Sequence, residues 1–522
     1  MSNSIKPLRI AFLTPRFAHD IESGPATYVY RITRVLKEMG HDPEVFAPSS
    51  NIEGPMDCYG IRVEYANPIH NLLIRLLCWL FQKHPRLGLR ETITDISNAW
   101  GLAKAFADRD KEKPFDLVHC IDWGLTGLFI NKHNGRQILT RCVWARDLFT
   151  KVEGRKWSLD NWLLTKLERL SVVKADRAYA PSRFLAEYMM QKYKIKLDVI
   201  RPPALLEMKP VEYIADLPNK YLIHFAGNLG LRKGTDLLAR ALPLVWQEEP
   251  DFKMVLAGQA DYPKPLMNRY RNNWKEKADH VKWLGPIKKP HLYSVLKRAE
   301  AAVLPSRCDN LPNTVIECLL LGIPVIGFRG ASVDELVEHR VNGYLVPMGD
   351  TEALAEAMIR VWRGEMIFAK EFPPLKDMEP HIAAFNLLKF AGFNILPSQV
   401  NKSNYFDPSI KGEITQFVTK PNTKNYNSSP VLKDLNPRST RAGKGFNIQP
   451  NGESALVVTC ENAGLWTTVV FGNTPLVTRY NSPTSLTANL PESLYKSSGI
   501  FPVFLKDEII GESNHLEFIV EI

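Results

Sequence analysis

The chain has no apolar run long enough to cross a membrane. Hydrophobic residues make up 45% of its 522 residues, but no run reaches the roughly 18 consecutive apolar residues that a membrane-spanning helix needs. The N-terminus, MSNSIKPLRIAFLTP, has only a short apolar core and no small-residue cleavage site, so it does not fit a signal peptide. We therefore expect a cytoplasmic protein.

Cysteine is scarce and irregularly spaced. The seven cysteines include no Cys-x-x-Cys pair, and their number is odd. Neither a disulfide framework nor a zinc site is expected from such a pattern. Both absences fit a reducing compartment and a protein without a structural metal.

Charge of one sign does not dominate either. Lys and Arg number 66 against 56 Asp and Glu, a net charge of +10. This mild excess suits an anionic ligand or an anionic membrane surface without requiring either. No basic run is interleaved with aromatic residues and no nucleic-acid-binding module is recognisable, so nucleic acid is not an expected partner.

Short apolar runs alternate with helical patterns in two long stretches of the chain. The runs of the first stretch, typical of buried parallel strands, are 8–14, 44–48, 115–122, 136–143 and 177–182. Those of the second stretch are 221–227, 253–258, 281–285, 301–306 and 324–328. Strands that alternate with helices predict two doubly wound α/β domains.

Changes in composition indicate the domain boundaries. Residues 202–220 are proline-rich and lack periodicity, which predicts a connection between a first domain, 1–203, and a second, 204–375. An amphipathic helix is expected within 376–397, followed by a linker rich in Asn, Ser, Pro and Lys at 398–440. Residues 441–522 show a period of two between turn residues, which predicts a small all-β sandwich.

The stretch 306–328, SRCDNLPNTVIECLLLGIPVIGF, carries the strongest chemical pattern. A strand is expected to end at Ser306, and a helix to begin near Asn313. The N-terminus of such a helix, at the carboxyl edge of a parallel sheet, offers free N–H groups and a favourable dipole to phosphate. Glu317, about one turn into the helix, could accept hydrogen bonds from two ribose hydroxyls, and Asp309 would face sugar hydroxyls.

This stretch resembles the donor-site motif of the large retaining glycosyltransferase family known as family 4 or group 1. That motif is an acidic residue, seven residues and a glutamate, followed by a small-residue turn and Pro-Val-Ile. Here it reads Asp309, NLPNTVI, Glu317 and GIPVIG. Asp309 shortens the usual glutamate. Pro312 replaces the usual glycine and has no N–H, which leaves the backbone of Asn313 and Thr314 to bind phosphate.

The resemblance covers residues 8–393 and implies two more parts of a donor site. In the loop NLGLRKG, 228–234, Lys233 matches the family's diphosphate-binding lysine. Asn228 stands at the family's arginine position, and Arg232 is expected to substitute for it. Fixed cations would stabilise the charge that develops on a departing diphosphate. Gly24 matches a glycine-rich loop whose backbone approaches the donor sugar.

The family's His-x-His-Asp pattern is incomplete in this chain. The sequence reads His119-Cys120-Ile121-Asp122, so that Ile121 replaces the second histidine. His119 and Asp122 are candidate acceptor residues by resemblance, although His119 on a buried strand also fits a structural role. Where a further histidine often follows the next strand, the chain has Arg141, a candidate for binding an acidic acceptor.

By resemblance, the fold is a GT-B arrangement of two Rossmann-like domains that face a cleft, with a small immunoglobulin-like sandwich that resembles IPT/TIG domains. The implied activity is retaining transfer of a sugar from a nucleotide-diphosphate sugar to a glycan, glycolipid or other cell-surface polysaccharide. No metal or other cofactor is implied. Two alternatives stay open: another GT-B activity, such as a sugar-nucleotide epimerase, and a sugar-binding protein that has lost catalysis.

A last segment bears on where the enzyme works. Residues 69–90, IHNLLIRLLCWLFQKHPRLGLR, mix bulky apolar residues with Arg75, Lys83, Arg86 and Arg90. Such a helix either packs on the first domain or lies at an anionic bilayer, where it would bring the enzyme to a lipid-linked acceptor. In the second case the protein would be peripheral at the inner face of the plasma membrane.

Overall fold

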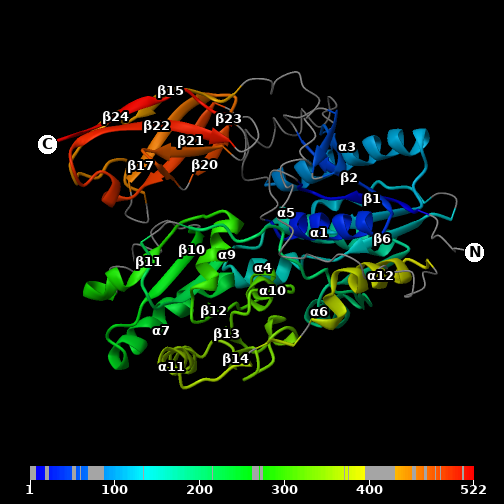
Figure 1. Cartoon of the computed structure of the whole chain (residues 1–522). Helices are drawn as coiled ribbons and strands as arrows, with labels where there is room; N and C mark the ends of the chain where they lie inside the picture. The colour runs from blue at the N-terminus through cyan, green and yellow to red at the C-terminus, as the bar shows by residue number, and fades with distance from the viewer. Residues whose placement is uncertain are drawn as a thin grey trace, which may run out of the picture. The chain divides into compact units, whose positions relative to one another are not determined.

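The computed structural model separates into two compact units, which are described in turn (Figure 1). The first contains two α/β domains and the second a β-sandwich. The structure describes residues 7–17, 23–49, 54–58, 60–68, 88–132, 135–213, 216–260, 270, 274–369, 371–373, 375–393, 429–449, 454–463, 467–476, 478–482, 484–507 and 511–522. The predicted helix at 69–90 lies outside these residues except for its last three positions.

The first domain is built on an eight-stranded sheet with the order β3-β4-β2-β1-β5-β6-β7-β8. From β4 to β8 every neighbouring pair is parallel. The strands are β1 (Arg9–Leu13), β2 (Asp42–Pro48), β3 (Gly54–Cys58), β4 (Ile61–Ala66), β5 (Leu117–Ile121), β6 (Gln137–Arg141), β7 (Arg177–Ala180) and β8 (Asp198–Val199). The five runs predicted from the sequence are β1, β2, β5, β6 and β7, and they form the middle of the sheet.

Helices cover this sheet. They are α1 (Gly24–Glu38), α3 (Arg90–Glu112), α4 (Arg146–Val152), α5 (Leu159–Lys174) and α6 (Arg183–Tyr193). Leu102 and Phe106 of α3 share a core with Ala11, Phe46 and other strand residues. Pro25 at the first turn of α1 suits a helix start, because the missing N–H would have had no intrahelical partner there.

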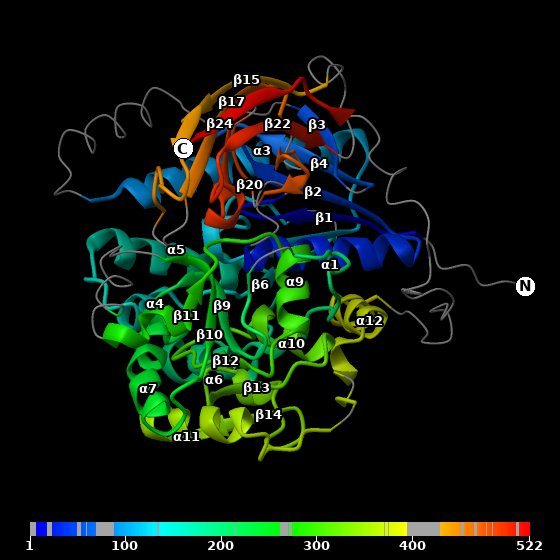
Figure 2. The same cartoon turned by 60° about the vertical axis from the view of Figure 1, so that its left-hand side comes forward.

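The second domain has a six-stranded parallel sheet with the order β11-β10-β9-β12-β13-β14. Its strands are β9 (Leu222–Leu229), β10 (Met254–Ala260), β11 (Val281–Trp283), β12 (Ala302–Leu304), β13 (Val325–Phe328) and β14 (Gly343–Val346). Its helices are α7 (Thr235–Glu248), α9 (Lys289–Lys297), α10 (Asn313–Leu320) and α11 (Thr351–Trp362). Helices α7 and α11 pack on one face and α9 and α10 on the other (Figure 2). Two Rossmann-like domains in one unit confirm the predicted GT-B fold class.

The chain passes between these two domains twice. The first crossing follows β8 and leads to β9. The second follows α11 and leads to α12 (Pro380–Phe390), which packs on α1 of the first domain (Figure 1). Phe390 lies edge-on to Tyr179 with 5.7 Å between ring centroids. The late helix therefore belongs to the first domain, although it comes after the second in sequence.

The second unit is a sandwich of two sheets, with orders β15-β17-β21-β20 and β16-β24-β22-β18-β19. Its strands are β15 (Val431–Asn436), β16 (Ser439–Arg441), β17 (Ser454–Glu461), β18 (Thr468–Phe471), β19 (Thr474–Pro475), β20 (Thr478–Ser482), β21 (Ser485–Leu490), β22 (Gly499–Asp507), β23 (Gly511–Glu512) and β24 (Leu516–Glu521). Leu456 and Leu486 of one sheet meet Phe471 and Phe518 of the other in one core. A small all-β domain is confirmed. The strand β15 lies inside the segment 398–440 that was predicted as linker.

Candidate donor and acceptor site

The loop between β9 and α7 is fixed on both sides. Gly234 has a φ of +73°, and a Cβ at this position would lie 1.9 Å from the carbonyl oxygen of Pro305. His224, buried in β9, places its Nδ1 2.7 Å from the Val303 carbonyl and its Nε2 2.9 Å from Thr235 Oγ1. The short 3₁₀ turn Leu231–Lys233 is therefore held against the loop that follows β12.

Three predicted donor residues meet at this place. Lys233 Nζ donates to Asp309 Oδ2, and Arg232 Nη1 lies 3.4 Å from Asp309 Oδ1. Asp309 is 8% exposed, and its loop is tied to Ser332, whose hydroxyl donates to the Asp309 carbonyl at 3.0 Å. The acidic residue expected to face sugar hydroxyls thus contacts the two cations expected to hold a diphosphate.

Electrostatics within this cluster follow from burial and from the short distances. Burial alone would raise the pKa of Asp309, but Lys233 and Arg232 outweigh burial and hold that pKa below its usual value. Burial lowers the pKa of Lys233, and Arg232 acts in the same direction while Asp309 opposes both. Arg232 also pairs with Glu153 at 3.4 Å, so the cluster holds two cations and two carboxylates in a largely enclosed place.

The predicted helix N-terminus is α10, which begins at Asn313 after Pro312. Glu317 is 3% exposed and forms ion pairs with Lys289 at 3.1 Å and with Arg31 at 3.6 Å. Arg31 comes from α1 of the first domain and also donates to Asn313 Oδ1 at 3.2 Å. The carboxylate proposed for ribose binding is therefore surrounded by cations from both domains.

Glu207 is a part of this site that the sequence did not reveal. It lies in the first crossing between the domains, 4% exposed, and pairs with Arg31 at 2.6 Å and with Lys289 at 3.1 Å. Tyr293 donates to its other oxygen at 2.6 Å. For Arg31 the sequence did offer a signal of a buried ion pair, because this charged residue lies among the apolar positions of α1.

The remaining donor candidates lie at the edges of this arrangement. A Cβ at Gly24 would be 3.9 Å from Asn313 Nδ2, so the glycine faces the start of α10. Thr314 is in the first turn of α10, and Asn228 lies near the end of β9, before the loop with Lys233. Gly24 and Asn313 are thus brought together from opposite domains.

Two of the acceptor candidates are held by the protein interior. His119 is fully buried in β5, with its Nε2 2.7 Å from the Tyr179 hydroxyl, and burial together with Arg141 lowers its pKa to about 3. Asp122 Oδ1 accepts the backbone N–H groups of Trp123 and Val143, each at 2.8 Å. Burial raises the pKa of Asp122 to about 7 despite these bonds. These contacts account for Asp122 and for Nε2 of His119, whereas Nδ1 of His119 is buried without a hydrogen-bond partner among the described residues.

Arg141 differs from these two. It ends β6, is 6% exposed, and its guanidinium carbon lies 3.4 Å from the centre of the Tyr28 ring. Its Nε and Nη1 atoms are buried and have no hydrogen-bond partner in the described part of the chain. Arg141 thus has two buried donors that the described residues leave unused.

The described residues contain neither a membrane-spanning helix nor a cluster of metal ligands. None of the helices described is long and apolar enough to cross a membrane. Across the same residues, no group of three or more His, Cys, Asp or Glu side chains is arranged to hold a metal ion.

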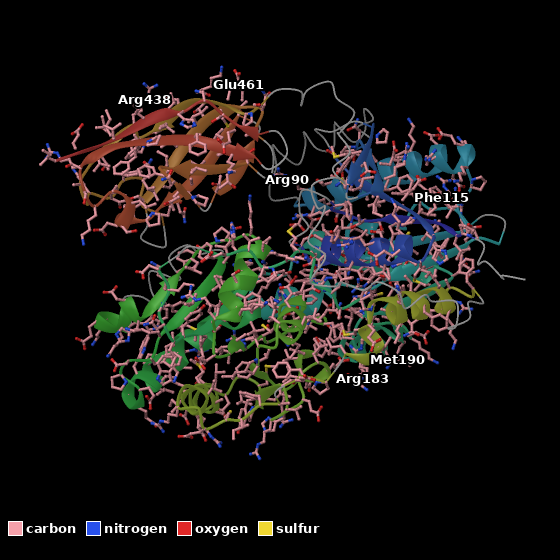
Figure 3. All side chains as sticks on the ribbon, in the orientation of Figure 1. Arg90, Phe115, Arg183, Met190, Arg438 and Glu461 are labelled. Carbon is pink, nitrogen blue, oxygen red and sulfur yellow. The ribbon has the colours of Figure 1, made fainter. Side chains whose placement is uncertain are left out.

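The contacts between the domains continue beyond Arg31: the backbone N–H of Arg183, labelled in Figure 3, donates to Glu335 at 2.9 Å.

Comparison with protein families gives two adjacent matches. Residues 23–204 match the model described as Glycosyltransferase Family 4. Residues 220–363 match the model described as Glycosyl transferases group 1. The first match covers most of the first domain and the second most of the second domain, and neither extends into the sandwich.

Individual proteins are similar over the same region. An uncharacterized glycosyltransferase of Methanocaldococcus jannaschii is 22% identical over 371 residues, 68% of this chain and 89% of the relative. A D-inositol 3-phosphate glycosyltransferase of Pseudarthrobacter chlorophenolicus is 27% identical over 347 residues, 62% and 78% of the two chains. Among solved structures, a sucrose-phosphate synthase of Thermosynechococcus elongatus is 18% identical with a TM-score of 0.52, covering 74% of this chain and 94% of that one. With both domain models matched and the fold in agreement, this chain is a glycosyltransferase with a GT-B fold.

Proposed function

We propose that this enzyme transfers a sugar from a nucleotide-diphosphate sugar with retention of anomeric configuration. One observation carries the proposal: Lys233, Arg232 and the N-terminus of α10 are all found at the carboxyl edge of the second sheet. Two cations and the free N–H groups of a helix start suit a diphosphate. The resemblance to the retaining family 4 supports the stereochemistry.

In this mechanism the chain stabilises the leaving group. The bond between the anomeric carbon and the diphosphate oxygen breaks while the acceptor hydroxyl attacks from the same face of the sugar. The acceptor proton passes to the departing diphosphate oxygen, so no protein base is required, and direct attack by the acceptor requires no protein nucleophile. Lys233 and Arg232 neutralise the charge that grows on that oxygen, an interaction that is strongest in the transition state.

Binding the diphosphate requires Asp309 to release the cations. Its carboxylate pairs with Lys233 and Arg232 in the described structure, and a diphosphate would compete for the same N–H donors. Once released, Asp309 is close enough to accept a hydrogen bond from a donor sugar hydroxyl. Glu317 is proposed to bind the ribose in a similar exchange, in which the ribose hydroxyls replace its contacts with Arg31 and Lys289.

The proposed acceptor is a glycan, a glycolipid or another cell-surface polysaccharide, bound by the first domain. The predicted membrane contact depends on residues 69–90, most of which lie outside the described residues, and it stays a prediction. So does the immunoglobulin-like identity of the sandwich. We further propose that transfer needs no metal, because Lys233 and Arg232 supply cations at the place of the leaving group.

The test uses nucleotide binding and turnover together. Wild-type protein is screened by thermal shift against UDP-, GDP- and ADP-sugars, because a ligand that binds only the folded state raises the melting temperature. Lys233→Met and Glu317→Gln are expected to lose most of that shift, and Lys297→Met, at an exposed position at the end of α9, to keep it. Unchanged binding and turnover in both site variants would contradict the proposed donor site. Activity abolished by EDTA would contradict metal-independent transfer.

The two alternatives predict different products from the same assay. An epimerase would convert the nucleotide sugar to an isomer without any acceptor, which chromatography of the reaction mixture detects. A sugar-binding protein would bind the donor but neither transfer nor slowly hydrolyse it. The replacement of the second histidine by Ile121 is the observation that favours this last outcome.

A further inference from the structure

Arg141 is unusual among the buried arginines that the structure describes. Three others are paired with carboxylates: Arg9 with Glu44 at 2.5 Å, Arg31 with Glu207 at 2.6 Å and Arg146 with Glu168 at 2.6 Å. Arg141 is equally buried but forms an ion pair with none of the described residues, and two of its nitrogens lack any hydrogen-bond partner there. A buried charge without a counter-ion is costly, so this arginine points to an anion that the described residues do not supply.

The position of Arg141 suits a ligand. It is the last residue of β6 and lies in register between Ile121 of β5 and Tyr179 of β7. Ligands of open parallel sheets bind at this carboxyl edge of the strands. The loop after β7 lies at the same edge and contacts the donor domain, where Ser182 Oγ and Asn310 Oδ1 are 2.7 Å apart. An anion on Arg141 would thus lie on the side of the first domain that meets the donor domain.

The surroundings of the guanidinium are mainly aromatic. Burial lowers the pKa of Arg141, Asp122 is close enough to raise it, and Arg31 is close enough to lower it. Tyr28 lies under its plane, and the hydroxyls of Tyr28 and Tyr179 are 2.7 Å apart. Asp122, at the end of the neighbouring strand, uses Oδ1 for two backbone N–H groups. Stacking on Tyr28 fixes the plane of the guanidinium while leaving its in-plane N–H donors available.

We infer that Arg141 binds a carboxylate or phosphate group of the sugar acceptor, so that the enzyme acts on acidic acceptors. The assignment to an acceptor rests on the proposed transferase function, whereas the anion site itself does not. A guanidinium offers two parallel N–H donors that match the two oxygens of an oxyanion. The chemical class is therefore a sugar acid or a phosphorylated sugar or polyol.

The first experiment separates an anion site from a structural role. Arg141→Met is expected to keep or raise the melting temperature in chloride buffer, because no carboxylate loses its partner. Arg146→Met is the matched control, and it is expected to lower the melting temperature because Glu168 stays buried without its cation. A loss in Arg141→Met as large as that in Arg146→Met would overturn the inference.

The second experiment measures the anion directly. Inorganic phosphate and malonate are added at millimolar concentration against sodium chloride of matched ionic strength. Both are expected to raise the melting temperature of the wild type and of Arg240→Met, an exposed control on α7, but not of Arg141→Met. Arg141→Lys should respond weakly, because lysine keeps the charge and loses the forked geometry. Equal protection of wild type and Arg141→Met would contradict the inference.

The third measurement distinguishes the acceptor from the donor. Titration with UDP, GDP and ADP is expected to give the same affinity in wild type and Arg141→Met, and a loss of about tenfold or more in Lys233→Met. If Arg141→Met loses nucleotide affinity as Lys233→Met does, Arg141 belongs to the donor site and the inference is wrong. If no nucleotide binds the wild type but phosphate protection still requires Arg141, the proposed function fails and the anion site stands.

Discussion

At the residue scale, Asp309 has two competing partners: the cations that it contacts in the described structure, and the proposed sugar of a bound donor. Its contacts with Lys233 and Arg232 leave both cations partly neutralised. A diphosphate must displace this carboxylate before it can bind them. We therefore expect the shortened side chain, Asp where the resemblance implies Glu, to affect donor affinity as well as sugar choice.

Asp309→Asn tests this competition. The neutral amide should release Lys233 and Arg232, so that a nucleoside diphosphate binds as tightly as in wild type or more tightly. Transfer should fall on the order of 10²-fold, because the contact to the donor sugar is weakened. Calorimetric titration and a transfer assay measure the two effects. Weaker diphosphate binding would mean that Asp309 positions the cations instead of competing for them.

His224 provides a pH-dependent contribution at the same scale. Burial lowers its pKa from 6.5 to about 4, with Lys233 acting in the same direction. A folded-state pKa below the unfolded value means that the neutral ring contributes stability above pH 6.5, and that this contribution is lost as pH falls through about 4.

We expect His224→Gln to lower the free energy of unfolding most at neutral pH, because it removes the hydrogen bonds to Val303 and Thr235. The difference in unfolding free energy between wild type and variant should shrink steadily as the pH is lowered toward 4. Urea unfolding at several pH values measures that difference. A difference that stays constant or grows on acidification would show that His224 carries a proton in the folded protein.

At the scale of elements, the turn from β9 into α7 depends on one glycine. Gly234 combines a left-handed φ of +73° with a close approach to Pro305. Gly234→Ala places a methyl group against a backbone oxygen that cannot move without shifting β12. We expect a loss of stability above the roughly 1–3 kcal/mol typical of a strained backbone position, measured by urea unfolding.

A matched change provides the control for this prediction. Gly322→Ala also places alanine at a positive φ, +74°, but nothing lies within 4 Å of its Cβ. Backbone strain alone should therefore lower the free energy of unfolding of Gly322→Ala relative to wild type. In Gly234→Ala, strain and the collision with Pro305 should both lower it. Equal losses in both variants would show that the contact with Pro305 contributes nothing.

The same scale shows what the sequence could predict. Continuous apolar runs identified β1, β5, β9 and β12 because central parallel strands are buried on both faces. Strand β4 was missed, since IRVEYA places Arg62 and Glu64 between its apolar residues. Strand β14, GYLV, was also missed, because only its last two residues, Leu345 and Val346, are aliphatic.

The candidate site was predictable where its residues are close in sequence. Asp309, Asn313 and Glu317 follow one another across a single strand-to-helix turn, and the structure places Asn313 and Glu317 on α10. Glu207 and Arg31 are 176 residues apart in sequence and meet only through the tertiary fold. No local pattern marks a glutamate in a proline-rich crossing as the partner of an arginine in a distant helix.

At the scale of the whole molecule, buried charges tie the two domains of the first unit together. Arg31 of α1 pairs with Glu317 of α10 and with Glu207 of the first crossing. Burial opposes ionisation of Glu207, but Arg31 and Lys289 prevail and lower its pKa to about 2. A lowered pKa means that this carboxylate contributes stability above pH 4.5, which is lost as pH falls toward 2.

Glu207→Gln should therefore be strongly destabilising at neutral pH. The change leaves Arg31 and Lys289 with one carboxylate in a buried place, which costs about 3–5 kcal/mol. The difference from wild type should disappear toward pH 2. Glu248→Gln, which removes an exposed partner of Arg363, is the control and should leave the unfolding midpoint unchanged. A small effect of Glu207→Gln would mean that Glu317 neutralises both cations alone.

The return of α12 to the first domain limits how the two domains can move. Both chain crossings run side by side, joined by a hydrogen bond of 2.7 Å from the Ala204 N–H to the Met378 carbonyl. We expect these two adjacent connecting segments to act as a hinge. Rotation of one domain about the line of the segments leaves both at the same length, whereas twisting or sliding across that line stretches one of them. We therefore expect rotation about this line to be the main movement of one domain relative to the other, and it would have to break the buried contact between Arg31 and Glu317.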